Sequence, residues 1–407
     1  MAETSSNCGV NYDIVIAGGG MVGASLALLL AAQSHRWKVL VVEANPQQQA
    51  STSFAPSFDA RSTALSFSTR RILEKIGLWP QLLPELAAIN SIQVSDRGHV
   101  ASTELHAHEQ QLDAFGYVVE NRRLGAVLNG ALINTDVEFA APATIDALEM
   151  VRDGVRLTLS DRQDAIHTSL LVVADGAQSA TREKLGIGCQ VDDYGQMGLI
   201  ANIALNKPHN GIAYERFTDN GPMALLPLLD AGSQHRSALV WTLPPERAGE
   251  LMVCSEADFL AELHHWFGYR QGQFNGVGER ACYPLKLIQA NEQVRRNIAV
   301  VGNAAHSLHP VAGQGFNLAL RDIAALAKTL DIGTKRGESC GDLALLQRYL
   351  NSQQKDQLRT VTASDWLPKL FAKTSPSVAL ARGAGLFAMD MMPGLRSQFA
   401  RYGMGLE

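Results

Sequence analysis

The sequence predicts an α/β protein in which a parallel sheet is interleaved with a mostly antiparallel sheet and followed by a helical C-terminal region. Three observations lead to this prediction. A strand, a glycine-rich turn, a helix and a second strand occupy residues 12–43. Two later segments, 171–182 and 301–318, repeat the succession of buried strand and turn. Several strand-like runs separated by turn residues fill 198–243, which is typical of an antiparallel sheet.

The composition is that of a globular chain with a large core. The chain has 407 residues, of which 46% are hydrophobic and 18% charged, so disorder, collagen and small disulfide-stabilised folds are excluded. This length allows two domains or one large interleaved domain. The five cysteines are an odd number, lie far apart and lack C-x-x-C spacing, which indicates reduced thiols and a cytoplasmic location.

The charge and the apolar runs exclude several kinds of partner and location. The net charge is −5 and the basic residues are dispersed, so we predict no nucleic-acid partner. Residues 1–11 are polar and lack the pattern of a signal peptide. No stretch reaches the roughly 20 uninterrupted apolar residues that a membrane-spanning helix needs.

The first unit of the parallel sheet is visible as three hydrophobic segments. Tyr12–Ala17 is a short β-branched run that ends in three glycines, as a buried parallel strand does. Met21–Gln33 follows with strong helix formers, and Lys38–Val42 is a second buried strand. These segments predict one βαβ unit.

The next elements are shorter and less regular. Gln47–Pro56 is rich in Gln, Ser and Thr and is predicted to be a loop. Ser68–Ile76 is predicted to be a helix that ends at Gly77. Alternating runs then predict strands around one helix, and these segments are Ser91–Val94, Tyr117–Glu120, Val155–Leu159 and the helix Leu124–Ile133.

Two more buried strands and a helical ending complete the pattern. Leu170–Val173 and Ile298–Val301 are apolar runs that end in turns, and the chain after Gly313 is mainly helical, with a break at Pro393. The elements alternate between a nucleotide domain and a substrate-covering domain. The predicted nucleotide domain comprises 1–90, 116–190 and 286–335, the substrate domain 91–115 and 191–285, and the helical region 336–407.

The first turn carries a G-x-G-x-x-G pattern directly after a strand. Gly18 permits the tight turn, Gly20 lets the backbone approach a pyrophosphate, and Gly23 lets helix and strand pack closely. The helix N-terminus supplies N–H donors and a partial positive charge for phosphates. Glu43 ends the second strand, where a carboxylate would accept the hydroxyls of an adenosine ribose. A glycine-rich turn with a surface glutamate is the alternative, and the combined context disfavours it.

This unit suits NAD and FAD equally, and the two later turns separate them. A plain NAD dehydrogenase has no use for three nucleotide-facing turns, whereas FAD has a ribityl chain and an isoalloxazine to hold. Asp175 and Gly176 alone would more often form a strand-ending turn than a site. Followed by Ser179 and Arg182 in this order, they favour a site.

With these motifs in order, the sequence is similar, nearly end to end, to the group A FAD-dependent aromatic hydroxylases. The motifs of that family are the dinucleotide fingerprint, a D-G motif that serves FAD and NAD(P)H, and a G-D-A-A-H…P…G-x-G-x-N motif for the flavin. Within the family, Phe58–Arg61 (FDAR), Ser95–His99 (SDRGH) and Tyr214–Phe217 (YERF) resemble the ubiquinone-biosynthesis branch. The resemblance implies a Rossmann-like FAD-binding domain interleaved with an antiparallel substrate domain.

The resemblance also implies which residues bind FAD. The ADP half of the cofactor would be held by Gly18, Gly20, Gly23 and Glu43. Arg61 and Arg122 would lie along its middle, and Asp175 and Gly176 near the pyrophosphate. Gly302 and Asn303 would face the ribityl chain. The flavin would be bound by Gly313, Gly315 and Asn317, with Pro310 beside the isoalloxazine. Asn303 stands where the family has Asp, so an acceptor oxygen is kept while the charge is lost.

Two other patterns have competing interpretations. His306 and His309 lie three residues apart, but no further ligand type is near them, so no metal is predicted. Arg216 is equally compatible with a functional residue and with a solvated strand charge.

The activity implied by the resemblance is a monooxygenation. NAD(P)H reduces FAD, O₂ adds to give a flavin C4a-hydroperoxide, and the ring of a polyprenylated phenol on the way to ubiquinone is hydroxylated. The protein positions the ring and excludes water, and the sequence assigns no catalytic residue. The alternatives are another FAD oxidoreductase of the same fold and a non-catalytic flavin-holding subunit of a biosynthetic complex.

The apolar segments Trp366–Phe371 and Leu386–Met392 favour a helix packed on the core or on a partner over membrane contact. A polyprenyl substrate nevertheless resides in the bilayer. We therefore expect a cytoplasmic protein that either contacts the inner face of the membrane peripherally or receives the lipid within a ubiquinone-biosynthesis complex.

Overall fold

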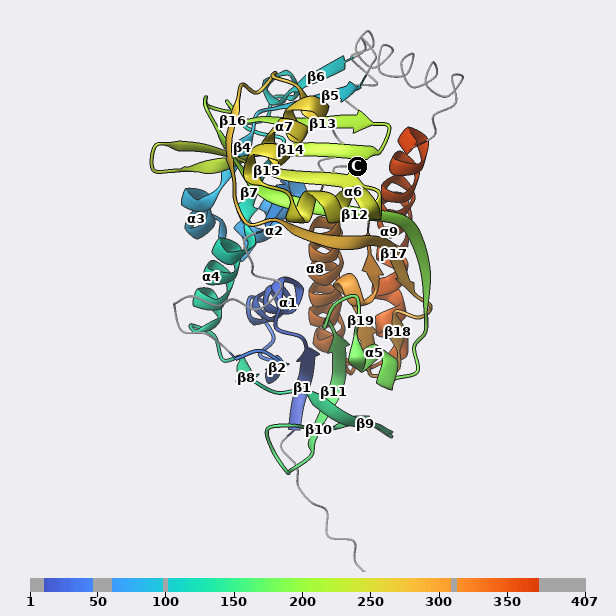
Figure 1. The fold of residues 1–407 in the computed structure, drawn as a ribbon. Helices are drawn as coiled ribbons and strands as arrows, with labels where there is room; N and C mark the ends of the chain where they lie inside the picture. Colours follow the sequence, from blue (N-terminus) through green and yellow to red (C-terminus); the bar gives the residue numbers. More distant parts are fainter. Residues whose placement is uncertain (1–10, 47–60, 98–101, 309–312, 373–407) are drawn as a thin grey trace, which may run out of the picture.

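A computed structural model describes residues 11–46, 61–97, 102–308 and 313–372, with side chains in the last segment described to residue 365 (Figure 1). The strands of the parallel sheet lie at one end of the molecule and the antiparallel sheet at the other, with helices α1 and α8 between them (Figure 1). The predicted combination of a parallel sheet, an antiparallel sheet and C-terminal helices is confirmed.

The parallel sheet has the strand order β18-β19-β11-β1-β2-β8. In the centre of this sheet four strands pair in parallel, and they are β19 (Ile298–Val300), β11 (Ile166–Val173), β1 (Asn11–Ala17) and β2 (Val39–Val42). Strand β8 (Glu138–Ala140) adds to one edge, and β18 (Val294–Arg295) pairs antiparallel at the other. These central strands are almost entirely buried, because both faces of the sheet are covered, which explains their continuous apolar runs.

Helices cover one face of this sheet and a hairpin covers the other. The helical side consists of α1 (Met21–Ala31), α4 (Asn121–Leu132) and α8 (Gln314–Lys335), which share one core cluster with Ile14 and Val41. Helix α9 (Leu343–Ala372) packs on α8. The opposite face, with Val15 and Leu40, packs on the hairpin β9 (Ile145–Val151) and β10 (Gly154–Leu159) and on the turn after α5 (Ala180–Lys184).

The antiparallel sheet has the order β20-β17-β12-β15-β14-β13-β5-β6. Its strands are β5 (Ser91–Asp96), β6 (Ser102–His106), β12 (Cys189–Leu205), β13 (Ile212–Thr218), β14 (Gly221–Ala231), β15 (Gln234–Leu243), β16 (Phe274–Val277), β17 (Ala281–Ala290) and β20 (His306–Ser307). Only β5 and β13 run parallel to each other among the described pairs. Helices α6 (Pro245–Val253) and α7 (Glu256–Phe267) cover its outer face around Trp241.

A third, three-stranded sheet lies between these two and is a feature that the sequence did not predict. It consists of β3 (Ser62–Ser66), β7 (Gly116–Glu120) and β4 (Ala87–Ile89), followed by α2 (Phe67–Lys75) and α3 (Trp79–Leu82). Helices α6 and α7 and strand β9 were also missed. The predicted loop Gln47–Pro56 and the break at Pro393 lie outside the described residues.

Candidate functional site

The three motif turns meet at one edge of the parallel sheet. Strands β1, β2, β11 and β19 all end there, and backbone hydrogen bonds join the residues that follow them. Gly18 N donates to Val42 O over 2.8 Å, Ala174 N to Ala17 O over 2.8 Å, and Val301 N to Val173 O over 2.9 Å. Ligands of open α/β sheets bind at this carboxyl edge, so the fold brings the predicted turns to the position that a dinucleotide needs.

Gly18 and Gly23 occupy places that admit no side chain. Gly18 has a φ of +102°, and a Cβ on it would lie 2.6 Å from Ala174 O. A Cβ on Gly23 would lie 1.9 Å from Gly18 O. Gly20 is the N-cap of α1, and neither a capping side chain nor an acidic residue serves the first turn of this helix. The N–H groups at the start of α1 are therefore arranged for an anionic ligand.

Glu43 is tied to the glycine turn across the sheet edge. Its Oε2 accepts a hydrogen bond from Gly19 N at 2.7 Å, and its Oε1 accepts from Asn45 N at 2.9 Å and Asn45 Nδ2 at 2.7 Å. The carboxylate is half-buried and lies beside the turn that would carry the pyrophosphate. The ribose contact remains a prediction.

The second turn is braced by its own side chains. Asp175 caps α5 by accepting from Ser179 Oγ and, at 3.0 Å, from Thr181 N, and Gly176 has a φ of +92°. Arg182 is buried and donates to Ala304 O at 2.8 Å, which joins this turn to the third one. Both Asp175 oxygens are thus engaged within the chain, and a contact of this residue with the pyrophosphate is still a prediction.

The third turn passes directly over the first helix. Gly302 has a φ of +62°, and a Cβ on it would lie 3.0 Å from Val22 Cγ1 on α1. Asn303 is exposed at this turn. His306 is buried, and burial lowers its pKa to about 4, so the imidazole is neutral at physiological pH. Within the described part of the chain, no three His, Cys, Asp or Glu side chains form a group that could hold a metal, and His309 lies outside it.

Asn317 holds the start of α8 against the third sheet. Its Oδ1 accepts from Ser66 N at 2.8 Å and Thr69 Oγ1 at 2.7 Å, and its Nδ2 donates to Ala64 O and Gly313 O at 2.8 Å each. Asn317 is therefore a residue that positions the backbone at Gly313, which has a φ of +61°. A Cβ on Gly315 would meet no atom within 4 Å, and Pro310 lies outside the described residues.

Arg61 and Arg122 lie together at the end of the β3–β7 pair. Asn121 N donates to Arg61 O at 2.7 Å, and Arg122 Nη2 donates to Glu120 Oε1 at 3.0 Å. Glu120 is buried, and its Oε1 also accepts a hydrogen bond from Arg236 Nη1 at 3.4 Å. Sequence reasoning did not single out Arg236 as a site residue. The Nε of Arg122 is buried and has no hydrogen-bond partner among the described residues, so this donor is available to a ligand.

These features fit FAD. The uncapped N-terminus of α1 suits the pyrophosphate, the first turn presents glycines instead of side chains to it, and the Nε of Arg122 has no partner among the described residues. When bound, FAD would accept electrons from NAD(P)H and pass them to O₂. The chain itself would hold the cofactor and exclude water from the reaction.

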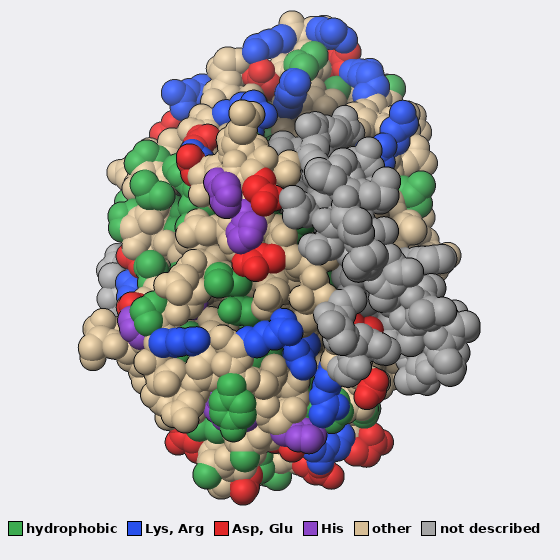
Figure 2. All heavy atoms as spheres, turned by 90° about the horizontal axis from the view of Figure 1, so that it is seen from above, with side chains coloured by type: hydrophobic (Ala, Val, Ile, Leu, Met, Phe, Trp, Pro, Cys, Tyr) green, Lys and Arg blue, Asp and Glu red, His purple; other side chains and the backbone are tan. Residues whose placement is uncertain are grey.

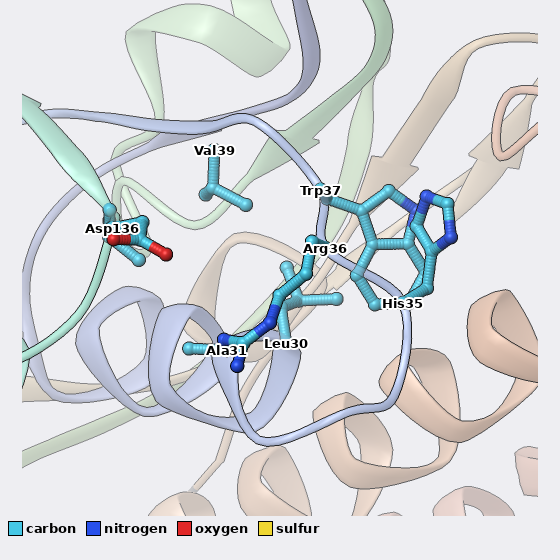
Figure 3. Close-up of a pocket in the computed structure, with 8 residues that line it drawn as sticks. Leu30, Ala31, His35, Arg36, Trp37, Val39 and Asp136 are labelled. Atoms are coloured by element: carbon cyan, nitrogen blue, oxygen red, sulfur yellow. The ribbon is translucent and has the colours of Figure 1, made fainter.

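A small pocket elsewhere is not part of this site. It lies between the end of α1 and the start of β2 and is lined by residues that include Ala31, His35, Trp37 and Asp136 (Figure 3). Because β2 begins at Val39, this pocket lies at the amino-terminal edge of the parallel sheet, opposite the motif turns.

On the face seen in Figure 2, basic, acidic and apolar side chains are interspersed.

Arg216 and Glu215 on β13 have opposite surroundings. Arg216 Nε donates to Trp266 O at 3.0 Å on the outer face, so this residue is bound to α7 and is not a solvated strand charge. Glu215 points to the inner face, and sequence reasoning did not single it out as a functional residue. The sequence signal that could have identified Glu215 was a carboxylate in the middle of a strand-like run that is otherwise mainly hydrophobic.

Comparisons with known proteins agree with the site. The chain matches the FAD binding domain family over residues 11–354. It is 38% identical to the ubiquinone hydroxylase UbiL of Rhodospirillum rubrum, over 97% of this chain and 89% of the relative. It is 31% identical to the 3-demethoxyubiquinol 3-hydroxylase of Escherichia coli, over 97% and 98% of the two chains.

A solved structure has the same fold. The p-nitrophenol 4-monooxygenase PnpA of Pseudomonas putida aligns with a TM-score of 0.77 over 98% of this chain and 99% of its own, at 17% identity. The predicted FAD cofactor and the predicted monooxygenase class are confirmed. The chain belongs to the family of FAD-dependent ubiquinone-biosynthesis hydroxylases.

Proposed function

We propose that this chain hydroxylates the ring of a polyprenylated phenol, and that its activity corresponds to that of a 2-octaprenyl-6-methoxyphenol hydroxylase. The observation that carries the ring hydroxylation is the near full-length similarity to two ubiquinone-pathway hydroxylases, combined with three motif turns at one sheet edge. The motifs Ser95–His99 and Tyr214–Phe217 support the member assignment by their resemblance to that enzyme.

The test uses the purified full chain. A yellow protein should oxidise NAD(P)H and consume O₂ only when a prenylated phenol is present, and the product should carry one ¹⁸O atom from labelled O₂. A prenyl reductase would not consume O₂, and a flavin-holding subunit would bind FAD without turnover. A colourless protein that does not take up FAD would contradict every flavoenzyme interpretation.

The ring position and the member assignment need a separate experiment. Mass spectrometry of the quinone intermediates that accumulate in a deletion strain identifies the missing hydroxylation. Accumulation of a prenylphenol that already carries the methoxy group supports the proposed assignment. Accumulation of demethoxyubiquinone would instead indicate the activity named for the Escherichia coli relative.

We further propose that the substrate reaches the protein at the inner face of the membrane, directly or through a biosynthetic complex. Among the described helices, none is long and apolar enough to cross a membrane. Flotation with liposomes that contain ubiquinone-pathway lipids tests direct contact. Co-purification with pathway enzymes but no flotation would favour delivery within a complex.

A further inference from the structure

Four neighbouring strands of the antiparallel sheet place one residue each in a row across the inner face. Ile200 on β12 pairs with Val240 on β15, Val240 pairs with Ala224 on β14, and Ala224 pairs with Glu215 on β13. All four side chains retain partial exposure, although their neighbours along each strand on the outer face, such as Leu225 and Trp241, are buried. The row is therefore a surface that helices α6 and α7 do not cover.

The contacts of the flanking residues fix the direction of Glu215. Successive residues of a strand point to opposite faces. Tyr214 stacks edge-on against Phe267 of α7, with ring centroids 5.5 Å apart, and Arg216 donates to Trp266 O. Both flanking side chains thus face α7, so Glu215 points to the inner face, on the side of α9 and the third sheet.

The carboxyl group of Glu215 lacks a partner on this face. No described residue donates a hydrogen bond to it or forms an ion pair with it. Burial alone raises its pKa to about 7, although the side chain keeps partial exposure. Burial therefore favours the neutral carboxyl of Glu215 over its carboxylate.

Among the described side chains, the other charged groups near β13 either have partners or point to the outer face. On β5, the buried Asp96 lies one step along the same face, and on β14 the inner residues beside Glu215 are uncharged. On α9, Asp356 pairs with Arg321, and Asp365 accepts from Tyr194 Oη at 2.8 Å. On β13 itself, Arg216 is directed to the outer face.

We propose that Glu215 is the catalytic base that accepts the hydroxyl proton of the substrate phenol, whose ring lies against the row of Ile200, Val240 and Ala224. This inference rests on the proposed function. The phenol O–H bond breaks, its electron pair stays on the phenol oxygen, and the proton passes to a Glu215 carboxylate oxygen, which becomes a neutral carboxyl. The electron pair on oxygen makes the ring more nucleophilic toward the oxygen that the cofactor delivers.

The protonation states suit this role at physiological pH. A base is most effective when its pKa lies near the working pH, and a free phenol has a pKa near 10. Glu215 is neutral below about pH 7 and a carboxylate above it. Hydroxylation should therefore rise with pH through about 7. An apolar row beside one carboxylate also suits a ring that carries a hydroxyl and a hydrocarbon chain.

The test compares wild type with Glu215→Gln, which keeps the shape and loses the base. We expect product formation to fall by roughly 10²–10⁴-fold, the usual contribution of a general base. The rise with pH should disappear, while the FAD content stays normal. Glu215→Asp should retain the pH-dependent rise. Glu279→Gln, at an exposed glutamate outside the row, is the matched control and should behave as wild type.

A binding measurement provides a readout that does not depend on turnover. The affinity of wild type for an unreactive phenol analogue, followed by tryptophan fluorescence, should increase roughly tenfold as pH rises through about 7, because hydrogen bonds to charged acceptors are stronger. Glu215→Gln should bind with a pH-independent affinity. If Glu215→Gln fails to fold, an unchanged wild-type affinity across this range overturns the proposal.

The outcomes separate the two proposals. If wild type hydroxylates no phenol, the proposed function is wrong. If wild type is active and Glu215→Gln keeps its rate and pH profile, the proposed function stands and the assignment of Glu215 is wrong. Phenols with electron-withdrawing substituents ionise more readily, so they should lose less activity in Glu215→Gln than the natural substrate does.

Discussion

Gly23 has no room for a side chain, because an added Cβ would lie 1.9 Å from the carbonyl oxygen of Gly18. We expect Gly23→Ala to push α1 away from the glycine turn and to abolish FAD binding. Gly130→Ala is the matched control, since it lies exposed within α4 and a Cβ there would meet no atom within 4 Å.

The control should stabilise the protein by up to about 1 kcal/mol, the difference in helix propensity between Ala and Gly. Absorbance of the purified variants measures the flavin content, and thermal unfolding of the apoprotein measures stability. A normal flavin spectrum in Gly23→Ala would show that the turn tolerates the displacement.

Asn317 uses both its acceptor oxygen and its amide donors inside the protein, and its side chain is 1% exposed. Asn317→Asp keeps the acceptor for Ser66 and Thr69 but faces the carbonyl oxygens of Ala64 and Gly313 with a carboxylate. Each unsatisfied buried group costs about 1–3 kcal/mol. We therefore expect a less stable protein with weaker FAD binding, measured by urea unfolding and flavin titration. Wild-type values for both would contradict the positioning role.

At the scale of elements, the packing of α8 on α9 encloses a carboxyl group. Asp322 on α8 is 2% exposed, and no described residue forms a hydrogen bond with its Oδ1. Burial is the main cause that raises the pKa of Asp322 to about 7, with a smaller contribution from Asp356 on α9. Tyr349 of α9 is buried nearby, and its pKa is also raised. The helix pair therefore favours a protonated Asp322.

This shift makes stability fall as pH rises. Between the unfolded pKa near 3.9 and the folded pKa of about 7, the native state holds a proton that the unfolded chain has lost. The free energy of unfolding should decrease by about 1.4 kcal/mol per pH unit in this window from this group. Asp322→Asn should lack that component and be more stable than wild type at pH 8. Urea unfolding from pH 4 to 8 measures it, and parallel curves for the two proteins would refute it.

At the scale of the whole molecule, Glu120 connects the third sheet to the antiparallel sheet and to helix α4. It ends β7 of the third sheet, and it accepts from Arg122 on α4, Arg236 on β15 and Asn202 on β12. Glu120 and Arg236 are 8% and 16% exposed, so little water compensates for the loss of either charge. Removing one partner of such a buried pair typically costs about 3–5 kcal/mol.

We expect Glu120→Gln and Arg236→Met each to destabilise the protein, and the double variant to lose less than the sum of the two. Urea unfolding of the four proteins gives the coupling energy. The exposed pair Glu149 and Arg156, at 65% and 57%, is the control, and Glu149→Gln should change stability by less than about 1 kcal/mol. Additive losses at Glu120 and Arg236 would mean that the two side chains do not interact.

Local patterns in the sequence determined the parallel sheet and its motif turns. Strands β1, β2 and β11 are buried on both faces, so each is a short apolar run that is recognisable by itself. The turn at Gly18–Gly23 has a residue-by-residue chemical logic, and the structure brings it to the sheet edge where the other two turns lie. The FAD cofactor was inferred from these turns, and the hydroxylase family from the resemblance of the motifs to that family.

Only the tertiary structure decided what lies between the two large sheets. In the third sheet, β3 pairs with β7 although about fifty residues separate these two strands in the sequence. No local sequence pattern encodes such a pairing. Asn317 meets Ser66 across 251 positions. The face that Glu215 occupies depends on the register of β13 with its neighbours and on the packing of α7 against Tyr214 and Arg216. Hydrophobic periodicity reports burial along one segment, whereas the surroundings of a polar side chain depend on residues distant in sequence.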